Sequence, residues 1–145
     1  MTDLQRCAVK RLADLEDKKI RLSYLNEKLK LLEMKSDGLY AYNYEKVKVQ
    51  TGINNAENSM IDNIYTREKV DAEINYITFE IDMIDHLLST LPENEKLVLE
   101  RFFIHREKYA VPRLIEELGY EQSQIYRIRT AAVEHLTNLL YGRSK

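Results

Sequence analysis

The stretch LIEELGY at residues 114–120 decides how the last third of this 145-residue sequence folds. Its two leucines stand four residues apart, so they share one face of a helix. Gly119 follows directly, and glycine accepts the positive φ that a tight turn after a helix requires. Apolar residues return at helical spacing beyond the turn. We therefore expect a short helix over residues 111–118, a turn, and a longer helix over residues 122–140.

A third helix is expected over residues 93–105, just after Pro92. In all three segments the apolar residues recur three and four positions apart, which allows them to bury a common core. The expected core is Leu97, Val98, Phe102, Phe103, Val111, Leu114, Ile115, Leu118, Ile125, Ile128, Ala132, Val133, Leu136 and Leu139/Leu140. A short helix, a turn with glycine and a longer helix form a helix-turn-helix, so residues 91–145 are predicted to be a DNA-binding domain.

The geometry of a helix-turn-helix assigns roles to the polar residues of this domain. The first helix crosses the phosphates, and the second enters the major groove with its N-terminal residues on the base edges. Glutamine can pair with adenine and arginine with guanine. The expected base-reading residues are Gln122, Ser123, Tyr126 and Arg127. The expected phosphate contacts are Lys108, Tyr109, Arg113, Arg129 and Thr130. A solvated face without a ligand is the alternative, but the shortage of acidic residues there favours DNA.

The first ninety residues show a different pattern, typical of two long helices. Over residues 3–35, one heptad seam runs through Leu4, Ala8, Arg11, Leu15, Lys18, Leu22, Leu25, Leu29 and Leu32. Over residues 58–90, with Asn58 or Ser59 as the expected cap, the seam runs through Met60, Asn63, Arg67, Val70, Ile74, Ile77, Ile81, Ile84, Leu88 and Leu91. Such regular spacing favours a coiled coil. An all-α protein is therefore expected, with an antiparallel coiled-coil hairpin at residues 1–90 before the DNA-binding domain.

Charge indicates how these two helices pair. The first carries nine basic and six acidic residues over 1–35, and the second carries two basic and seven acidic residues over 58–91. Opposite charge favours their pairing with each other, either within one chain or between two chains. The expected oligomerisation residues are Leu22, Leu25, Leu29, Ile74, Ile77, Ile81 and Ile84. A homodimer is expected, because one DNA-binding head in a chain of net charge −2 would bind weakly alone.

Residues 38–57, between the two helices, are expected to be extended chain or an ordered loop. Tyrosines alternate at positions 40, 42 and 44, and valines then alternate with lysines from Lys46 to Val49. A period of two with aromatic and β-branched residues is typical of a strand. Asp37-Gly38 is suited to ending the preceding helix. A packed hairpin and a contact with polymerase or DNA are both open interpretations of this insertion.

The segment from Leu91-Pro92 to Leu136 resembles the C-terminal promoter-recognising domain, region 4, of sigma-70-type RNA polymerase factors. The resemblance lies in Leu-Pro, an acidic helix ending in aromatics, the Leu-Gly helix and the recognition helix. Ala110 and Glu121 stand where that family usually has Ser or Thr caps, and Ile115 replaces a small residue. The resemblance implies RNA polymerase as a partner.

The stretch YEKVKVQT at residues 44–51 resembles a signature of small phage proteins from Gram-positive hosts, the ArpU and RinA type of transcriptional regulators. In these a helical hairpin precedes a sigma-like helix-turn-helix. The resemblance spans nearly the whole chain and implies a phage transcriptional regulator, an activator of late genes, acting on double-stranded promoter or operator DNA.

Other function classes have weaker support in the sequence. A phage packaging protein of the small-terminase kind and a coiled-coil protein that binds a host factor are the alternatives. No enzyme, cofactor or metal site is expected, because the three histidines are far apart and no phosphate-binding Gly loop or nucleophile elbow occurs. With no apolar run of about 18 residues and one cysteine, Cys7, we expect a protein of the bacterial cytoplasm that contacts no membrane.

Overall fold

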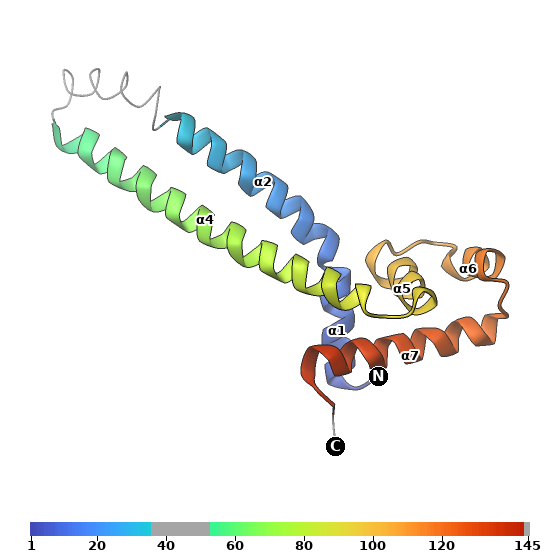
Figure 1. Cartoon of the computed structure of the whole chain (residues 1–145). Coiled ribbons are helices and arrows are strands. Elements are labelled where there is room, and N and C mark those ends of the chain that lie inside the picture. Colours follow the sequence, from blue (N-terminus) through green and yellow to red (C-terminus); the bar gives the residue numbers. More distant parts are fainter. Residues whose placement is uncertain (36–52, 144–145) are drawn as a thin grey trace. The chain divides into compact units, whose positions relative to one another are not determined.

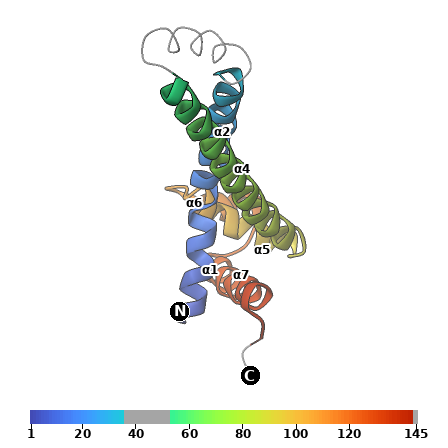
Figure 2. The same cartoon turned by 90° about the vertical axis from the view of Figure 1, so that its left-hand side faces the viewer.

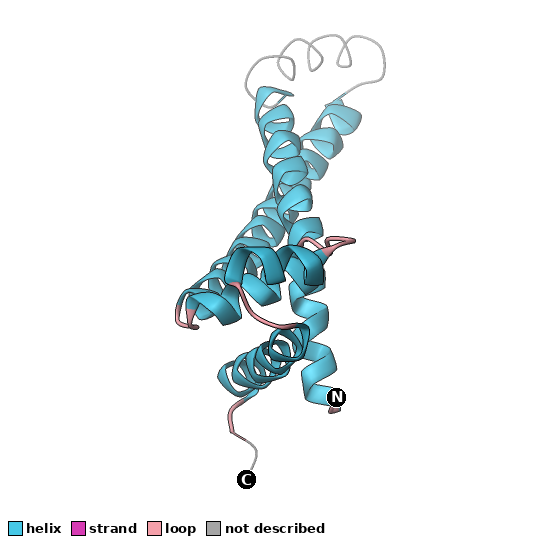
Figure 3. Cartoon of the chain, turned by 90° about the vertical axis from the view of Figure 1, so that its right-hand side faces the viewer, coloured by secondary structure: helices cyan, strands magenta, loops and turns pink. Residues whose placement is uncertain are grey.

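The chain is all-α in the parts that the structure describes, which are residues 1–35 and 53–143 of a computed structural model (Figures 1 and 3). Side chains are described for residues 1–35 and 58–143. The elements are α1 (Asp3–Ala13), α2 (Leu15–Met34), α4 (Ile53–Ser89), α5 (Glu93–Leu99), the π-helix η2 (Glu100–Ile104), α6 (Ala110–Leu118) and α7 (Gln122–Tyr141). The all-α class predicted from the sequence is confirmed.

The contacts divide the chain into two compact units, which are described separately. One unit contains residues 1–19 and 80–145, and the other contains residues 20–79. The first unit therefore combines the N-terminal helix with the C-terminal helices. The sequence pattern divides the chain between residues 90 and 91, whereas the contacts group its two ends together.

The unit of residues 20–79 consists of α2 and α4 lying side by side and antiparallel (Figure 1). Arg21 on α2 makes a two-pronged ion pair with Glu73 on α4, with Nε–Oε1 at 3.0 Å and Nη2–Oε2 at 3.2 Å. Leu25 and Val70 from the two seams are buried. The basic helix thus pairs with the acidic helix within one chain, which was one of the two arrangements that their charges favoured.

Two predicted helix boundaries are wrong. The expected single helix over residues 3–35 is divided at Asp14, a poor residue for a helix interior, although its N–H still bonds Lys10 O at 2.9 Å. The second helix starts at Ile53, so the cap at Asn58 or Ser59 and the extended chain over residues 53–57 are wrong. Once a helix is nucleated, each added residue gains a hydrogen bond, which outweighs local turn propensity. Residues 36–52, with the Tyr44–Val49 pattern and Gly38, lie outside the described residues.

The C-terminal helices follow the sequence closely. The segment predicted at 93–105 forms α5 and η2, and the helices predicted at 111–118 and 122–140 are α6 and α7. The buried residues Val98, Leu114 and Ile125 come one from each of α5, α6 and α7, and they form one core. Leu139 is a correction, since it is 47% exposed rather than part of this core. In its second half α7 also buries Ala132, Val133 and Leu136. This part of α7 belongs to the same unit as α1.

Candidate nucleic-acid interface

The candidate interface is built on the turn between α6 and α7. Gly119 has φ 71°, the left-handed conformation expected of it, and its N–H bonds Ile115 O at 2.9 Å. An added Cβ at Gly119 would meet no atom within 4 Å, so the conformation alone selects glycine here. The turn is short enough that α7 begins three residues after α6 ends.

The inward face of α7 fixes which of its residues reach solvent. Ile125 is fully buried against Val98 and Leu114, and Ile128 packs against the same cluster. The side chains on the other side of the first two turns and beyond are exposed: Gln122, Ser123, Gln124, Arg127 and Thr130. Tyr126 lies at the edge of this face and is 36% exposed. The four predicted base-reading residues therefore stand on one exposed helix face.

Arg129 is held by aromatic rings rather than projecting freely. Its guanidinium carbon lies 4.7 Å from the centre of the Tyr126 ring and 5.1 Å from that of Phe102. The two rings are themselves 6.3 Å apart, between η2 and α7. A cation over an aromatic face is stabilised by the ring quadrupole. Arg129 therefore fixes Tyr126, and its half-buried side chain offers less reach to a phosphate than an exposed arginine.

The other predicted phosphate residues occupy two places. Thr130 follows Arg129 on α7, and its hydroxyl donates to Tyr126 O at 3.0 Å. Lys108 and Tyr109 are exposed just before α6, with the Lys108 ammonium 5.7 Å from the Tyr109 ring. Arg113 lies in the first turn of α6 and is 3.5 Å from Glu107. Three of the predicted phosphate contacts thus lie at the start of α6 and two on α7.

Neither α6 nor α7 has a side-chain cap. The cap residues are Tyr109 for α6 and Glu121 for α7, and no side-chain hydrogen bond is made at either. The absence of Ser or Thr at these helix starts was visible in the sequence. Uncapped N-terminal N–H groups carry partial positive charge and suit phosphate oxygens. This favours phosphate at the start of α6, whereas the carboxylate of Glu121 opposes it at the start of α7.

An ion-pair network that sequence spacing did not reveal holds α6 in place. Arg101 of η2 reaches Glu117 with two contacts of 2.9 Å and Glu107 at 3.2 Å. The pKa of Arg101 is raised, first by its hydrogen bond to Glu117 and then by the nearby charge of Glu107. These contacts pair one arginine with two acidic side chains beside the candidate interface. They span six and sixteen residues, so no local pattern would indicate them.

The N-terminal helix α1 packs against α7, which the sequence also did not reveal (Figure 2). Ala8 and Leu12 are fully buried, and Arg11 lies 5.4 Å from the centre of the Tyr141 ring. A shallow pocket of about 200 Å³ is lined by Met1, Gln5, Arg129, Thr130 and Val133. Residues of α1 therefore border the phosphate side of the candidate interface.

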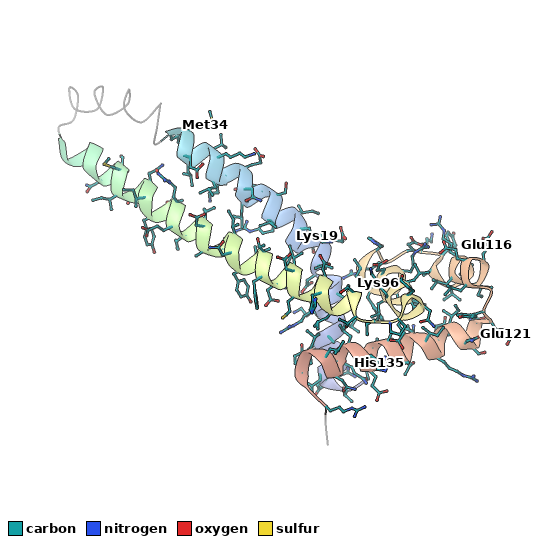
Figure 4. The ribbon with its side chains drawn as sticks, viewed as in Figure 1. Lys19, Met34, Lys96, Glu116, Glu121 and His135 are labelled. Carbon is teal, nitrogen blue, oxygen red and sulfur yellow. The ribbon has the colours of Figure 1, made fainter. Side chains whose placement is uncertain are left out.

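A third unpredicted contact in this unit joins His135 to Glu95. His135 lies on the part of α7 beyond the candidate interface (Figure 4). Glu95 is buried at 8% exposure, and its Oε2 lies 2.8 Å from Nδ1 of His135. The pair ties the first turn of α5 to α7. A sequence separation of forty residues explains why it was missed.

The predicted oligomerisation residues lie on the seams of α2 and α4. Leu25, Ile77, Ile81 and Ile84 are buried within the single chain, and Leu22, Leu29 and Ile74 are half-buried. A dimer formed through the buried side chains would require α2 and α4 of one chain to separate first. Pairing between chains through the seams stays a prediction.

Three further findings concern metal ions, membrane-spanning helices and similarity to known proteins. Across the described residues, no three His, Cys, Asp or Glu side chains gather closely enough to hold a metal ion. None of the described helices is long and apolar enough to cross a membrane. Neither a family model, nor a curated protein, nor a solved structure matches this chain.

Proposed function

We propose that this chain is a sequence-specific DNA-binding transcription regulator, with α6 and α7 as its helix-turn-helix and α7 as the recognition helix. One observation carries the proposal, namely the row of exposed Gln122, Ser123 and Arg127 on a helix whose opposite side is fixed in a three-helix core. These are donors and acceptors that can read base edges in the major groove. Such a rigid mounting is what a recognition helix needs, since its side chains must keep a fixed register.

The electrostatics of the described surface support the same function. No acidic residue occurs from Gln122 to Val133, and Arg101 pairs with Glu107 and Glu117 nearby. The uncapped start of α6 adds positive potential. The whole chain has a net charge of −2, so its attraction to DNA comes from this face and not from bulk charge.

The biological setting follows the resemblances noted in the sequence. We propose an activator of phage late genes of the ArpU and RinA type, binding a promoter or operator and contacting host RNA polymerase as sigma region 4 does. The coiled-coil hairpin of α2 and α4 serves assembly in this proposal. With two copies bound, the operator should contain two half-sites.

Selection from a pool of random duplexes by the purified full chain tests DNA recognition. We expect a sequence to be enriched and to bind 10³-fold or more tighter than a scrambled duplex, on the order expected of specific readers. Equal affinity for both duplexes, or failure to enrich any sequence, would refute sequence-specific binding. Activation is then measured by transcription from a template that carries the selected site, with host polymerase and with or without the protein.

A second candidate function is a protein-binding module, favoured by the apolar side chains that α2 and α4 expose. In this case the hairpin would bind a partner protein and the surface of α7 would be a solvated face. Failure to bind any selected duplex, together with capture of a host protein by the hairpin, would favour it over DNA recognition.

A further inference from the structure

The helix α4 has two apolar faces, of which the chain covers one. Val70 and Ile77 lie on the covered seam. On the opposite side the exposed fractions are 65% for Phe79, 64% for Tyr76, 62% for Ile61 and 59% for Tyr65. Figure 4 shows side chains standing out from α4 on the side away from α2. We call the exposed set Ile61, Ile64, Tyr65, Tyr76 and Phe79 the outer stripe.

We propose that the outer stripe is the interface between two copies of this chain, packed α4 against α4 in antiparallel orientation. The inference does not depend on DNA binding. In this proposal the two copies are joined by the exposed face of α4 and not by the seam residues predicted from the sequence.

The spacing of the outer stripe makes it complementary to itself. Ile61 and Phe79 are 18 residues apart, about five turns, so they project in the same direction. Tyr65 and Tyr76 are 11 residues apart, about three turns, and lie on one flank of that line. The pattern is nearly symmetric about Val70: Ile61 and Phe79 each lie nine residues away, and Tyr65 and Tyr76 lie five and six residues away. In a twofold antiparallel pair Ile61 meets Phe79 of the second copy and Tyr65 meets Tyr76, each twice, as a symmetric dimer requires.

Charged residues also lie near the centre of the stripe, where the twofold axis places the Glu68 residues of the two copies four residues apart, about 6 Å along the helix axis. Glu68 comes opposite Ala72 of the second copy, whose small side chain leaves the carboxylate a path to solvent. Lys69 already lies 5.2 Å from the ring centre of Tyr65 in its own chain, on the flank where the second copy's Tyr76 would add another aromatic ring. A lysine between rings is a favourable cation–π site.

The apolar area reaches the lower end of what a stable dimer buries. Three exposed aromatic side chains and two aliphatic ones offer on the order of 600 Å² per copy, against about 600–1,000 Å² on each side of a standard interface. The outer face of α2 is also apolar but carries a smaller set, Ile20, Tyr24, Leu31 and Met34. Its single aromatic ring offers less area, so α4 is the stronger surface.

Mass in solution tests the interface. For the full chain at micromolar concentrations, sedimentation equilibrium should give twice 17.2 kDa. Replacing Tyr65→Ser together with Phe79→Ser should raise the dissociation constant at least about tenfold, since aromatic anchors dominate interfaces. The matched control, Tyr24→Ser with Leu31→Ser on α2, should leave it unchanged. All four positions are exposed, and circular dichroism verifies that each variant keeps its helix content. A monomeric wild type, or a larger loss from the α2 pair, would overturn the proposal.

Cross-linking tests the orientation independently of affinity. In a Cys7→Ser background, chains with Ile61→Cys mixed with chains with Phe79→Cys should form a mixed disulfide. Neither variant alone should cross-link, because like positions lie about 27 Å apart in the antiparallel pair. Self-cross-linking of each variant would indicate a parallel pair, and no cross-link in any mixture would show that the outer stripes do not meet. Either result contradicts the antiparallel interface.

Discussion

Arg127 is the residue on which sequence-specific recognition most depends in our proposal. It is exposed on the recognition face, and no side chain of the described residues is recorded in an ion pair with it. Arg129, two residues further, is instead held by Phe102 and Tyr126. Two arginines of one helix therefore differ in surroundings, since Arg127 is exposed and Arg129 is packed against aromatic rings.

Arg127→Ala should weaken binding of the selected duplex about 10- to 100-fold, the ~1–3 kcal/mol of a bidentate base contact, with no change in unfolding. Fluorescence anisotropy against the selected and a scrambled duplex measures it. The charge-matched control is Arg143→Ala, exposed just beyond the other end of α7. Equal losses for the two variants would show that Arg127 contributes charge alone.

His135→Ala should destabilise the chain by about 1–2 kcal/mol, because it leaves the buried Glu95 carboxylate without its 2.8 Å partner. Urea unfolding followed by circular dichroism measures the change. The exposed His86 provides the matched control, and His86→Ala should change stability by less than ~0.5 kcal/mol. Similar values for both variants would mean that the pair with Glu95 contributes nothing to stability.

Among the elements, the turn at Gly119 and the core beneath it place the recognition helix. The turn was predictable because glycine between two apolar helices has a local signature. The core of α5, α6 and α7 was predictable because its residues repeat at helical spacing. The break at Asp14 and the early start of α4 were not, because a helix boundary depends on small differences in propensity that tertiary packing overrides.

Gly119→Ala should cost about 1 kcal/mol of unfolding free energy, since alanine is strained at φ 71° although the site has room for its Cβ. Gly119→Asn should cost less, because asparagine visits the left-handed region more readily. Thermal or urea unfolding compares the three proteins. A larger loss for asparagine than for alanine would mean that space, not conformation, limits the turn.

Leu114→Ala should cost about 2–5 kcal/mol, because it opens a cavity in the shared core of α5, α6 and α7. It should also weaken DNA binding by loosening α7. Leu31→Ala, at a leucine that is 59% exposed on α2, is the comparison and should change stability by less than ~0.5 kcal/mol. Equal stability of the two variants would contradict the core described above.

At the scale of the whole chain, contacts between residues far apart in sequence were the ones that could not be predicted. Local periodicity indicated the helices and the polar face of α7. It contained no information on α1 packing against α7 or on Arg101 joining Glu107 and Glu117. Those contacts depend on which surfaces meet after folding, and many pairings satisfy the same helical pattern. Charge favoured pairing of the two long helices with each other, but it left open whether they pair within one chain or between two chains.

The salt dependence of DNA affinity tests the DNA-binding proposal and the dimer proposal together. Each phosphate contact contributes a slope of about −0.9 to log affinity against log salt concentration. If the outer stripe brings two heads to one operator, the slope for wild type should be about twice that of the Tyr65→Ser, Phe79→Ser variant. Anisotropy titrations over a range of salt concentrations measure both slopes. The same slope for both proteins would mean that one head binds at a time.

The union of residues 1–19 and 80–145 in one unit has a consequence for the order of events on the ribosome. The N-terminal segment leaves the ribosome exposing Ala8, Leu12 and Leu15, and the helix α7 that α1 packs against is made more than a hundred residues later. The intervening hairpin can fold as soon as it is made, because α2 and α4 are close in sequence. Its closure brings Lys18 to Glu80 and shortens the effective loop between the two halves of the unit. The hairpin thus prepares the assembly of the unit that contains α5, α6 and α7, which is completed only when α7 has been synthesised.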